Sequence, residues 1–138
     1  TYQFEGKRFL LAEDNEINAM IVIELLARRG AAVDRAENGQ AVVERFRSMP
    51  AGTYDAILMD IQMPVLNGWE AAEQIRGLNH EDAAVIPIIA LSANDYTEDV
   101  ERSRSVGMNG HVGKPIDLNV LKAQLAAATA EAAYRGNE

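Results

Sequence analysis

The sequence contains no cysteine, two histidines and one tryptophan in 138 residues. The lack of cysteine excludes disulfides, thiolate metal sites, iron–sulfur clusters and a cysteine nucleophile. Because the only histidines are His80 and His111, a zinc site is not expected either. No apolar run approaches the ~18 residues of a membrane span, and the first residues lack the apolar core of a secretory signal. We therefore expect one globular domain that makes no membrane contact.

Positive charge is also scarce. The chain has 13 Lys and Arg residues against 21 Asp and Glu residues, which gives a net charge of −8. An acidic chain repels phosphate backbones, so direct nucleic-acid binding is not expected. Hydrophobic residues make up 48% of the chain, which is typical of a folded domain rather than a disordered one.

Short apolar runs alternate with helical patterns along the chain. The predicted strands are 9–12, 31–36, 56–59, 85–91 and 111–113. The predicted helices are 17–29, 40–47, 68–76, 97–106 and 118–133, the last one capped by Asp117. The apolar runs are continuous rather than alternating, as in strands that are buried on both faces of a parallel sheet. The sequence therefore predicts an α/β doubly wound domain with right-handed crossovers.

Polar residues interrupt this pattern at the ends of the predicted strands, at Asp14, Asp60, Ser92 and Lys114. A single Asp after a strand is more often a turn former or a helix cap, and a single Lys is usually solvated. Four such residues at strand ends are expected to meet, because sites in open α/β sheets form at the carboxyl edge. Glu13 adds a second acid beside Asp14.

These residue types suit phosphoryl chemistry. Three neighbouring carboxylates, Glu13, Asp14 and Asp60, either bind protons more tightly or require a cation. Oxygen ligands without His or Cys favour Mg²⁺. Asp60 is the candidate nucleophile because carboxylates form acyl phosphates, and Ser92 and Lys114 are the candidate partners of the phosphoryl oxygens.

Two other classes of protein fit the sequence less well. Metal-dependent phosphatases and phosphotransferases that use an aspartyl phosphate usually have a general-acid Asp two residues after the nucleophile, where this chain has Gln62. A flavin or nucleotide binder needs a glycine-rich phosphate loop after the first strand. The residues at that place, Glu13 to Glu16, would repel phosphate unless a metal intervened.

Four fragments, taken together and in order, resemble the receiver domain of two-component response regulators. They are Glu13-Asp14-Asn15, Met59-Asp60-Ile61-Gln62-Met63-Pro64 with Gly68, Ala90-Leu91-Ser92-Ala93 and Lys114-Pro115. The resemblance covers about residues 7–130 and is strongest to receivers of hybrid sensor histidine kinases. It implies a flavodoxin-like (βα)5 fold with strand order 2-1-3-4-5. It also implies a receiver domain over 7–133, preceded by a linker at 1–6 and followed by a tail at 134–138.

The resemblance also implies a role for each site residue. Asp60 accepts a phosphoryl group from a phosphohistidine. Mg²⁺, or Mn²⁺ in its place, is bound directly by Asp14 and Asp60, through water by Glu13, and by the backbone carbonyl of Gln62. Ser92 and Lys114 contact the phosphoryl oxygens. Such a domain catalyses its own phosphorylation and dephosphorylation without turning over a metabolite, and inside a hybrid protein it is part of a histidine kinase.

Further residues match switch and tuning positions of the family. Ser92 and His111 are expected to move on phosphorylation. Many receivers have Tyr or Phe at the latter position. A histidine there gives the switch a group that can titrate near neutral pH, and the alternative is a half-buried structural histidine. Gln62 and Asn94 match positions that tune the lifetime of the phosphoryl group. The Lys114–Pro115 bond is expected to be cis, against a base rate of about 5%.

An exposed apolar face is predicted on the first helix. At 100° per residue, Ile17, Met20 and Ile21 lie away from the core side. The resemblance implies that this face of the first helix is the docking surface for a histidine kinase or a His-containing phosphotransfer domain. It also implies a cytoplasmic location. We expect a monomer. Dimers formed on phosphorylation, a free-standing regulator and a non-phosphorylated interaction module stay open as alternatives.

His80 and Trp69 are expected to have structural rather than functional roles. His80 lies in the polar stretch Asn79 to Asp82, which predicts a solvated loop residue. Trp69 follows Gly68 at the start of a predicted helix, which favours packing or a surface place over function.

Overall fold

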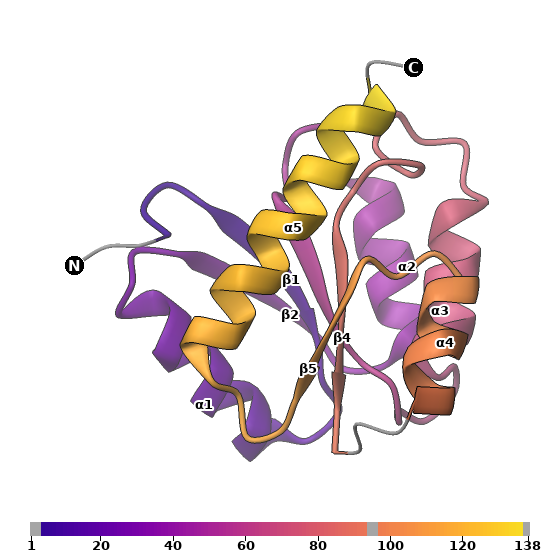
Figure 1. Cartoon of the computed structure of the whole chain (residues 1–138). Coiled ribbons are helices and arrows are strands. Elements are labelled where there is room, and N and C mark those ends of the chain that lie inside the picture. Colours follow the sequence, from indigo (N-terminus) through magenta and orange to yellow (C-terminus); the bar gives the residue numbers. More distant parts are fainter. Residues whose placement is uncertain (1–3, 94–96, 137–138) are drawn as a thin grey trace.

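The chain folds as five strands alternating with five helices over residues 4–93 and 97–136, the part described by this computed structural model. The strands are β1 (Arg8–Ala12), β2 (Ala32–Ala36), β3 (Ala56–Asp60), β4 (Ile88–Ser92) and β5 (Gly110–Gly113). The helices are α1 (Glu16–Ala27), α2 (Gly39–Ser48), α3 (Gly68–Arg76), α4 (Thr97–Ser105) and α5 (Leu118–Gly136). All strand pairs are parallel and the order is β2-β1-β3-β4-β5, which confirms the predicted fold (Figure 1).

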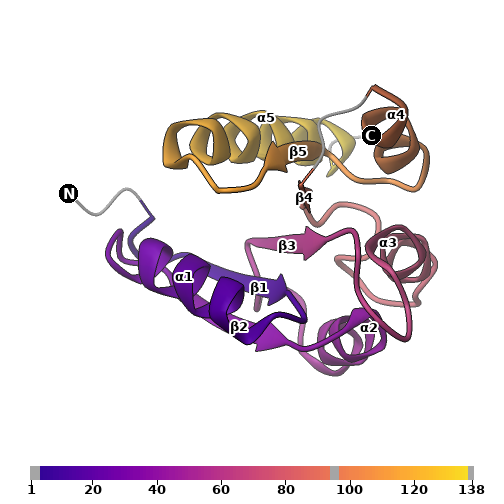
Figure 2. The ribbon, with the colours of Figure 1, turned by 90° about the horizontal axis from the view of Figure 1, so that it is seen from below.

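Helices cover both faces of the sheet. In the view from below, α1 and α5 lie on one side of the sheet and α2, α3 and α4 on the other (Figure 2). Neighbouring residues of one strand therefore enter different cores: Leu10 and Ile57 pack toward α2 and α3, whereas Leu11 and Leu58 pack toward α1 and α5. Each side chain of this size contributes about 1.5–3 kcal/mol when fully buried. This two-sided burial is the cause of the continuous apolar runs in the sequence.

The helices begin at side-chain caps. The side chains of Asn15 and Asn38 accept hydrogen bonds from backbone amides in the first turns of α1 and α2. Asn67 and Glu70 form a reciprocal capping box at the start of α3. Asp117 accepts from the amide of the second residue of α5, at 2.8 Å, as the sequence predicted. Caps of this kind contribute about 1 kcal/mol each and fix where each helix leaves the loop before it.

Some predicted boundaries differ from the structure. The fourth strand begins at Ile88, not at residue 85, because Val85 and Ile86 donate their amides to Asp82 in a turn and Pro87 has no amide to donate. The first helix ends at Ala27, since Gly30 turns the chain with a φ of +91°. The last helix continues beyond the predicted end at 133, to residue 136.

The prediction for His80 was wrong: it is a partly buried, hydrogen-bonded residue. Its Nε2 lies 2.8 Å from the carbonyl oxygen of Met49 and its Nδ1 accepts the amide of Asp82 at 3.0 Å. Its ring also packs against Phe46, with centroids 4.5 Å apart. The polar neighbours in the sequence suggested solvent, but the ring joins the end of α2 to the turn before β4.

Both ends of the described chain lie at the amino edge of the sheet, away from the strand ends that carry the polar residues. Phe4 is buried against Phe9, and its amide donates to the carbonyl of Arg29 at 2.9 Å. Helix α5 starts at the carboxyl edge and runs back antiparallel to the strands (Figure 1). Its residues Lys122 and Thr129 line a hollow together with Phe4. Among the described helices, none has the length and apolar character needed to cross a bilayer.

Candidate functional site

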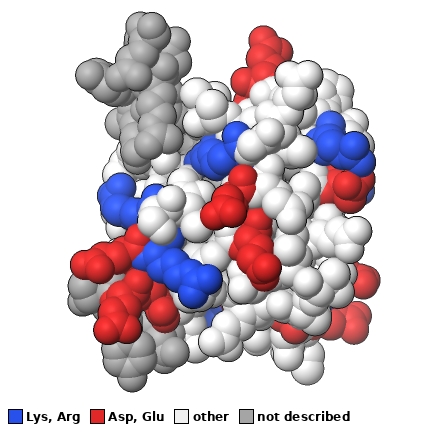
Figure 3. Space-filling model, turned by 90° about the vertical axis from the view of Figure 1, so that its right-hand side faces the viewer, with Lys and Arg blue, Asp and Glu red and all other residues white. Residues whose placement is uncertain are grey.

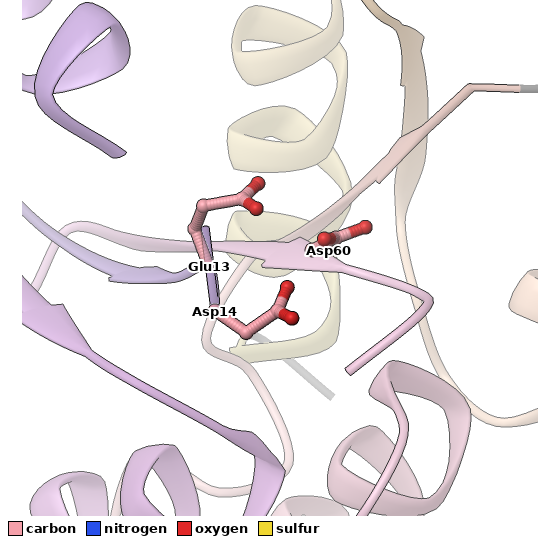
Figure 4. A group of neighbouring side chains, drawn as sticks. All are labelled: Glu13, Asp14 and Asp60. Carbon is pink, nitrogen blue, oxygen red and sulfur yellow. The ribbon is translucent and has the colours of Figure 1, made fainter. Parts of the chain in front are cut away.

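Three carboxylates meet at the carboxyl edge of the sheet. Glu13 and Asp14 follow β1, and Asp60 is the last residue of β3. One oxygen of each lies within 4.8 Å of the others, and the side chains turn toward one another (Figure 4). Glu13 and Asp60 are only 1% and 6% exposed, whereas Asp14 is open to solvent. The structure thus brings together the acids that the sequence placed at strand ends.

Lys114 joins the two buried acids. Its Nζ donates to Glu13 Oε2 at 2.8 Å and lies 3.2 Å from Asp60 Oδ2. Its amide donates to the carbonyl of Ser92 at 2.8 Å, so the ends of β4 and β5 are held side by side. Ser92 is buried at the end of β4, and the bond from Lys114 to Pro115 is cis, as expected.

Burial and neighbouring charges shift the pKa values of Asp60 and Lys114. Desolvation, and then the negative charge of Glu13, raise the pKa of Asp60 to about 6, although Lys114 and the amide of Gln62 favour its ionised form. Burial of Lys114 acts to lower its pKa. The hydrogen bond that Lys114 donates to Glu13 and the negative charge of Asp60 outweigh that effect, so the pKa of Lys114 is raised. At neutral pH the site therefore contains an ionised Asp60 beside a protonated Lys114.

The donor set fits a hard divalent cation. Three carboxylates face one ammonium group, so negative charge is in excess where their oxygens converge. Both oxygens of Glu13 already accept hydrogen bonds, from Lys114 and from the amide of Asn15. Asp14 is exposed and can turn an oxygen toward an ion. Carboxylate oxygens without nitrogen or sulfur ligands are typical of Mg²⁺ sites.

The backbone of Asp60 is packed directly against the start of α3. The amide of Gly68 donates to the carbonyl of Ile61 at 2.7 Å. A Cβ atom at Gly68 would lie 2.3 Å from the carbonyl oxygen of Asp60, so only glycine fits. The next residue, Trp69, donates its Nε1 to Ser103 Oγ at 2.9 Å and stacks under Arg102, which confirms that it packs.

Of the predicted tuning and switch residues, Gln62 and His111 are not part of the acidic cluster. Gln62 is exposed, and its amide donates to Asp60 Oδ1 at 3.3 Å. Asn94 lies outside the described residues. His111 is half-buried on β5, and its amide donates to Gln124 Oε1 at 3.2 Å. It lines a hollow of about 220 Å³ between α4, β5 and α5, together with Arg104.

The predicted apolar face of α1 is open to solvent. Ile17, Met20 and Ile21 are 70%, 62% and 59% exposed, whereas Ala19 and Val22 on the same helix are buried. Large apolar side chains with this exposure, next to the carboxyl edge of the sheet, form a contiguous surface that a partner can cover.

One residue near the site was missed by sequence reasoning. Arg35, at the end of β2, donates its Nε to the carbonyl of Glu13 at 3.1 Å and its Nη2 to the carbonyl of Asp14 at 3.2 Å. The only signal in the sequence is a pair of charges, Asp34 and Arg35, inside a strand that is otherwise apolar.

Comparison with known proteins identifies the family. The response regulator receiver domain family matches residues 9–126. The chain is 40% identical over 121 residues to the two-component response regulator ORR41 of Oryza sativa, covering 86% of this chain and 91% of that protein. It is 36% identical to hybrid signal transduction histidine kinase I of Dictyostelium discoideum, again over 86% of this chain but only 7% of that protein.

Solved structures agree with this assignment. The receiver domain of sensor histidine kinase PA1611 from Pseudomonas aeruginosa, which has a magnesium ion in its active-site cleft, superposes with a TM-score of 0.78 at 34% identity. That match covers 91% of this chain and 98% of the other. The receiver domain of Ssk1 from Saccharomyces cerevisiae, crystallised with the phosphotransfer protein Ypd1, gives 0.77 at 31% identity, covering 94% and 93%.

The chain belongs to the response regulator receiver domain family. It is a receiver domain of two-component phosphorelay signalling.

Proposed function

We propose that this receiver domain accepts a phosphoryl group on Asp60 from a phosphohistidine. The observation that carries the proposal is the placement of Asp60, a buried carboxylate between an acidic cluster and Lys114. An oxygen of Asp60 attacks the phosphorus, the P–N bond of the donor breaks, and the imidazole leaves as the acyl phosphate forms. The proposal includes hydrolysis of the acyl phosphate, which ends the signal: water attacks the phosphorus, the P–O bond to Asp60 breaks, and inorganic phosphate and the free carboxylate are released.

The same proposal assigns the cation site. Asp14 and Asp60 would bind Mg²⁺ directly, Glu13 through water, and Gln62 through its backbone carbonyl, with Mn²⁺ able to take its place. The two hydrogen bonds that Glu13 already accepts support its indirect role. When bound, the ion neutralises negative charge on the acceptor and on the phosphoryl group.

The proposal assigns Lys114 and Ser92 as donors to the phosphoryl oxygens, and Ser92 and His111 as residues that move on phosphorylation. Lys114 is 3.2 Å from Asp60 Oδ2, so its ammonium group can reach an oxygen of a phosphoryl group attached there. Ser92, at the end of the next strand, is proposed as a second donor and as a switch residue. His111 would then move into the space between α4 and β5, while Gln62 and Asn94 tune the lifetime of the acyl phosphate.

Intact mass spectrometry after incubation with acetyl phosphate and Mg²⁺ tests the acceptor. We expect one phosphoryl adduct that requires Mg²⁺ and is absent in Asp60→Asn. Asp55→Asn is the matched control, because Asp55 lies just before the same strand at its opposite end, where it accepts the amide of Arg8. That variant should form the adduct at the wild-type rate. A folded wild-type domain that forms no adduct would instead support a non-phosphorylated interaction module.

The proposed donors are a histidine kinase and a His-containing phosphotransfer domain, and a cytoplasmic location is part of the proposal. The complex of Ypd1 with the related receiver of Ssk1 supports this class of partner. We further propose that the domain is a monomer that can dimerise on phosphorylation. Direct binding to nucleic acid is not proposed, because the net charge is −8 and acidic and basic side chains lie side by side on the face with α3 and α4 (Figure 3).

The exposed face of α1 is the proposed docking surface for the donor. Replacing both Ile17 and Ile21 with Asp should slow phosphotransfer from a phosphorylated donor protein at least tenfold, because both side chains are more than half exposed and their loss removes apolar contact area. Phosphorylation by acetyl phosphate should be unchanged. The readout is the loss of label from the phosphodonor during rapid mixing.

The matched control for the docking test is the double variant Ala123→Asp and Ala127→Asp. These residues have the same i,i+4 spacing and are exposed on α5. Equal slowing in both double variants would show that added negative charge, and not the α1 surface, matters. Equal loss with acetyl phosphate would point to damage at Asp60.

A further inference from the structure

Asp14 differs from the other two acids in how it is held. Glu13 and Asp60 each accept hydrogen bonds on both carboxylate oxygens or pair with Lys114. The carboxylate of Asp14 is exposed and accepts no hydrogen bond from any residue of 4–93 or 97–136. Its direction toward Asp60 (Figure 4) therefore depends on the backbone from which it projects.

Arg35 holds that backbone. It is half-buried on β2, in register with Leu11 of β1, so its side chain can reach the loop that follows β1. Nε and Nη2 form one edge of the planar guanidinium, and this edge donates to two consecutive carbonyls, those of Glu13 and Asp14. Rotation of the peptide unit after Asp14 would break one of these bonds, and a shift of the loop would break both.

We propose that Arg35 is a positioning residue that fixes the loop of Glu13 and Asp14 and so presets the divalent cation site. This inference rests on the proposed function of the acidic cluster as a cation site. The charge of the guanidinium opposes a nearby cation. However, its Nε–H and Nη2–H point at the backbone carbonyls of Glu13 and Asp14. The carboxylates of these two residues turn toward Asp60 (Figure 4). Groups that orient ligands in this way typically change metal affinity by about 10–100-fold when they are mutated.

Lysine cannot replace this arrangement. An ammonium group is a single point donor, whereas the guanidinium presents two parallel N–H bonds at fixed spacing. The substitution Arg35→Lys therefore keeps the positive charge but cannot donate to both carbonyls at once. Arg35→Gln removes the positive charge and also one of the two N–H donor groups. If position matters more than charge, both substitutions weaken Mg²⁺ binding. If charge matters more, Arg35→Gln strengthens it.

Titration calorimetry with MgCl₂ alone, on the whole chain, separates these outcomes. We expect the Kd for Mg²⁺ to rise about tenfold in Arg35→Lys and in Arg35→Gln. The control is Arg28→Gln, which removes the same charge from an exposed pair with Glu24 on α1 and should leave the Kd unchanged. With saturating Mg²⁺, acetyl phosphate should label Asp60 in the control variant Arg28→Gln at the wild-type rate.

The proposal would be overturned by wild-type or tighter Mg²⁺ binding in Arg35→Gln, or by wild-type binding in Arg35→Lys. It would also be overturned if both variants fail to fold by circular dichroism, because Arg35 would then hold the fold rather than the loop. These outcomes are distinct from failure of the proposed function. A wild-type domain that binds Mg²⁺ but never forms the adduct refutes the acceptor role and leaves the role of Arg35 standing.

Discussion

In the absence of divalent metal, Asp60→Asn should be more stable than the wild-type domain, by up to about 3 kcal/mol at pH 8. The pKa of Asp60 is raised from 3.8 to about 6, mainly by burial and then by the charge of Glu13. The folded chain therefore binds a proton more tightly than the unfolded chain. The stabilising effect of that proton is fully present below pH 3.8 and is lost as the pH rises through about 6. Asparagine, which resembles the protonated acid, avoids that loss.

Urea unfolding in EDTA at pH 5, 6, 7 and 8 measures this effect. The difference in the free energy of unfolding between Asp60→Asn and wild type should grow across this range and level off above pH 7. Added Mg²⁺ should then stabilise the wild type more than the variant, because the ion binds a site from which one carboxylate has been removed. Asp55→Asn, outside the cluster, should show neither effect. A difference that does not change with pH would contradict the assigned cause.

Gly68→Ala should lower the free energy of unfolding by about 3 kcal/mol and slow phosphorylation by acetyl phosphate at least tenfold. The added Cβ would lie 2.3 Å from the carbonyl oxygen of Asp60 and 2.8 Å from Cα of Ile61. Both are backbone atoms, so the clash cannot be relieved by rotating a side chain. Either α3 or the end of β3 must move, and Asp60 moves with it.

Gly77→Ala is the matched control for this substitution. Gly77 follows α3 at its other end with a φ of −88°, and a Cβ there would meet its nearest neighbours at 3.6 and 3.7 Å. That variant should be within about 0.5 kcal/mol of wild type, or slightly more stable, because alanine restricts the unfolded chain. Chemical denaturation and the rate of adduct formation are measured for both. If the two alanine variants behave alike, the close contact at Gly68 does not constrain the site.

Much of the fold and site could be predicted because burial on two faces leaves a local pattern in the sequence. The runs around Leu10 and Ile57 are apolar at every position, and the first polar residues after them, Glu13 and Asp60, mark the strand ends. In a parallel sheet these ends meet at one edge, so residues far apart in the chain become neighbours without any further information.

The features that the sequence did not reveal depend on contacts between distant segments. His80 looked solvated because its neighbours in the chain are polar, but Met49 and Phe46 lie beside it in the structure. The hydrogen bonds from Arg35 to the loop between β1 and α1 depend on the register of β2 against β1, which no local sequence pattern encodes. The raised pKa of Asp60 depends on how deeply it is buried, which is set by the packing of the whole edge.

Helix α5 runs antiparallel to the strands and ends at the amino edge of the sheet, which affects how the domain can be connected within a longer protein. The described chain begins at Phe4 and ends at Gly136, and both residues lie at the edge of the sheet opposite the acidic cluster of Asp60. The geometry thus suits insertion into a longer polypeptide as well as independent existence. This agrees with the two relatives, since the matched region is 91% of one protein and 7% of the other. Because both ends lie away from the acidic cluster, a receiver fold of this geometry can be joined to other domains without a change at that cluster.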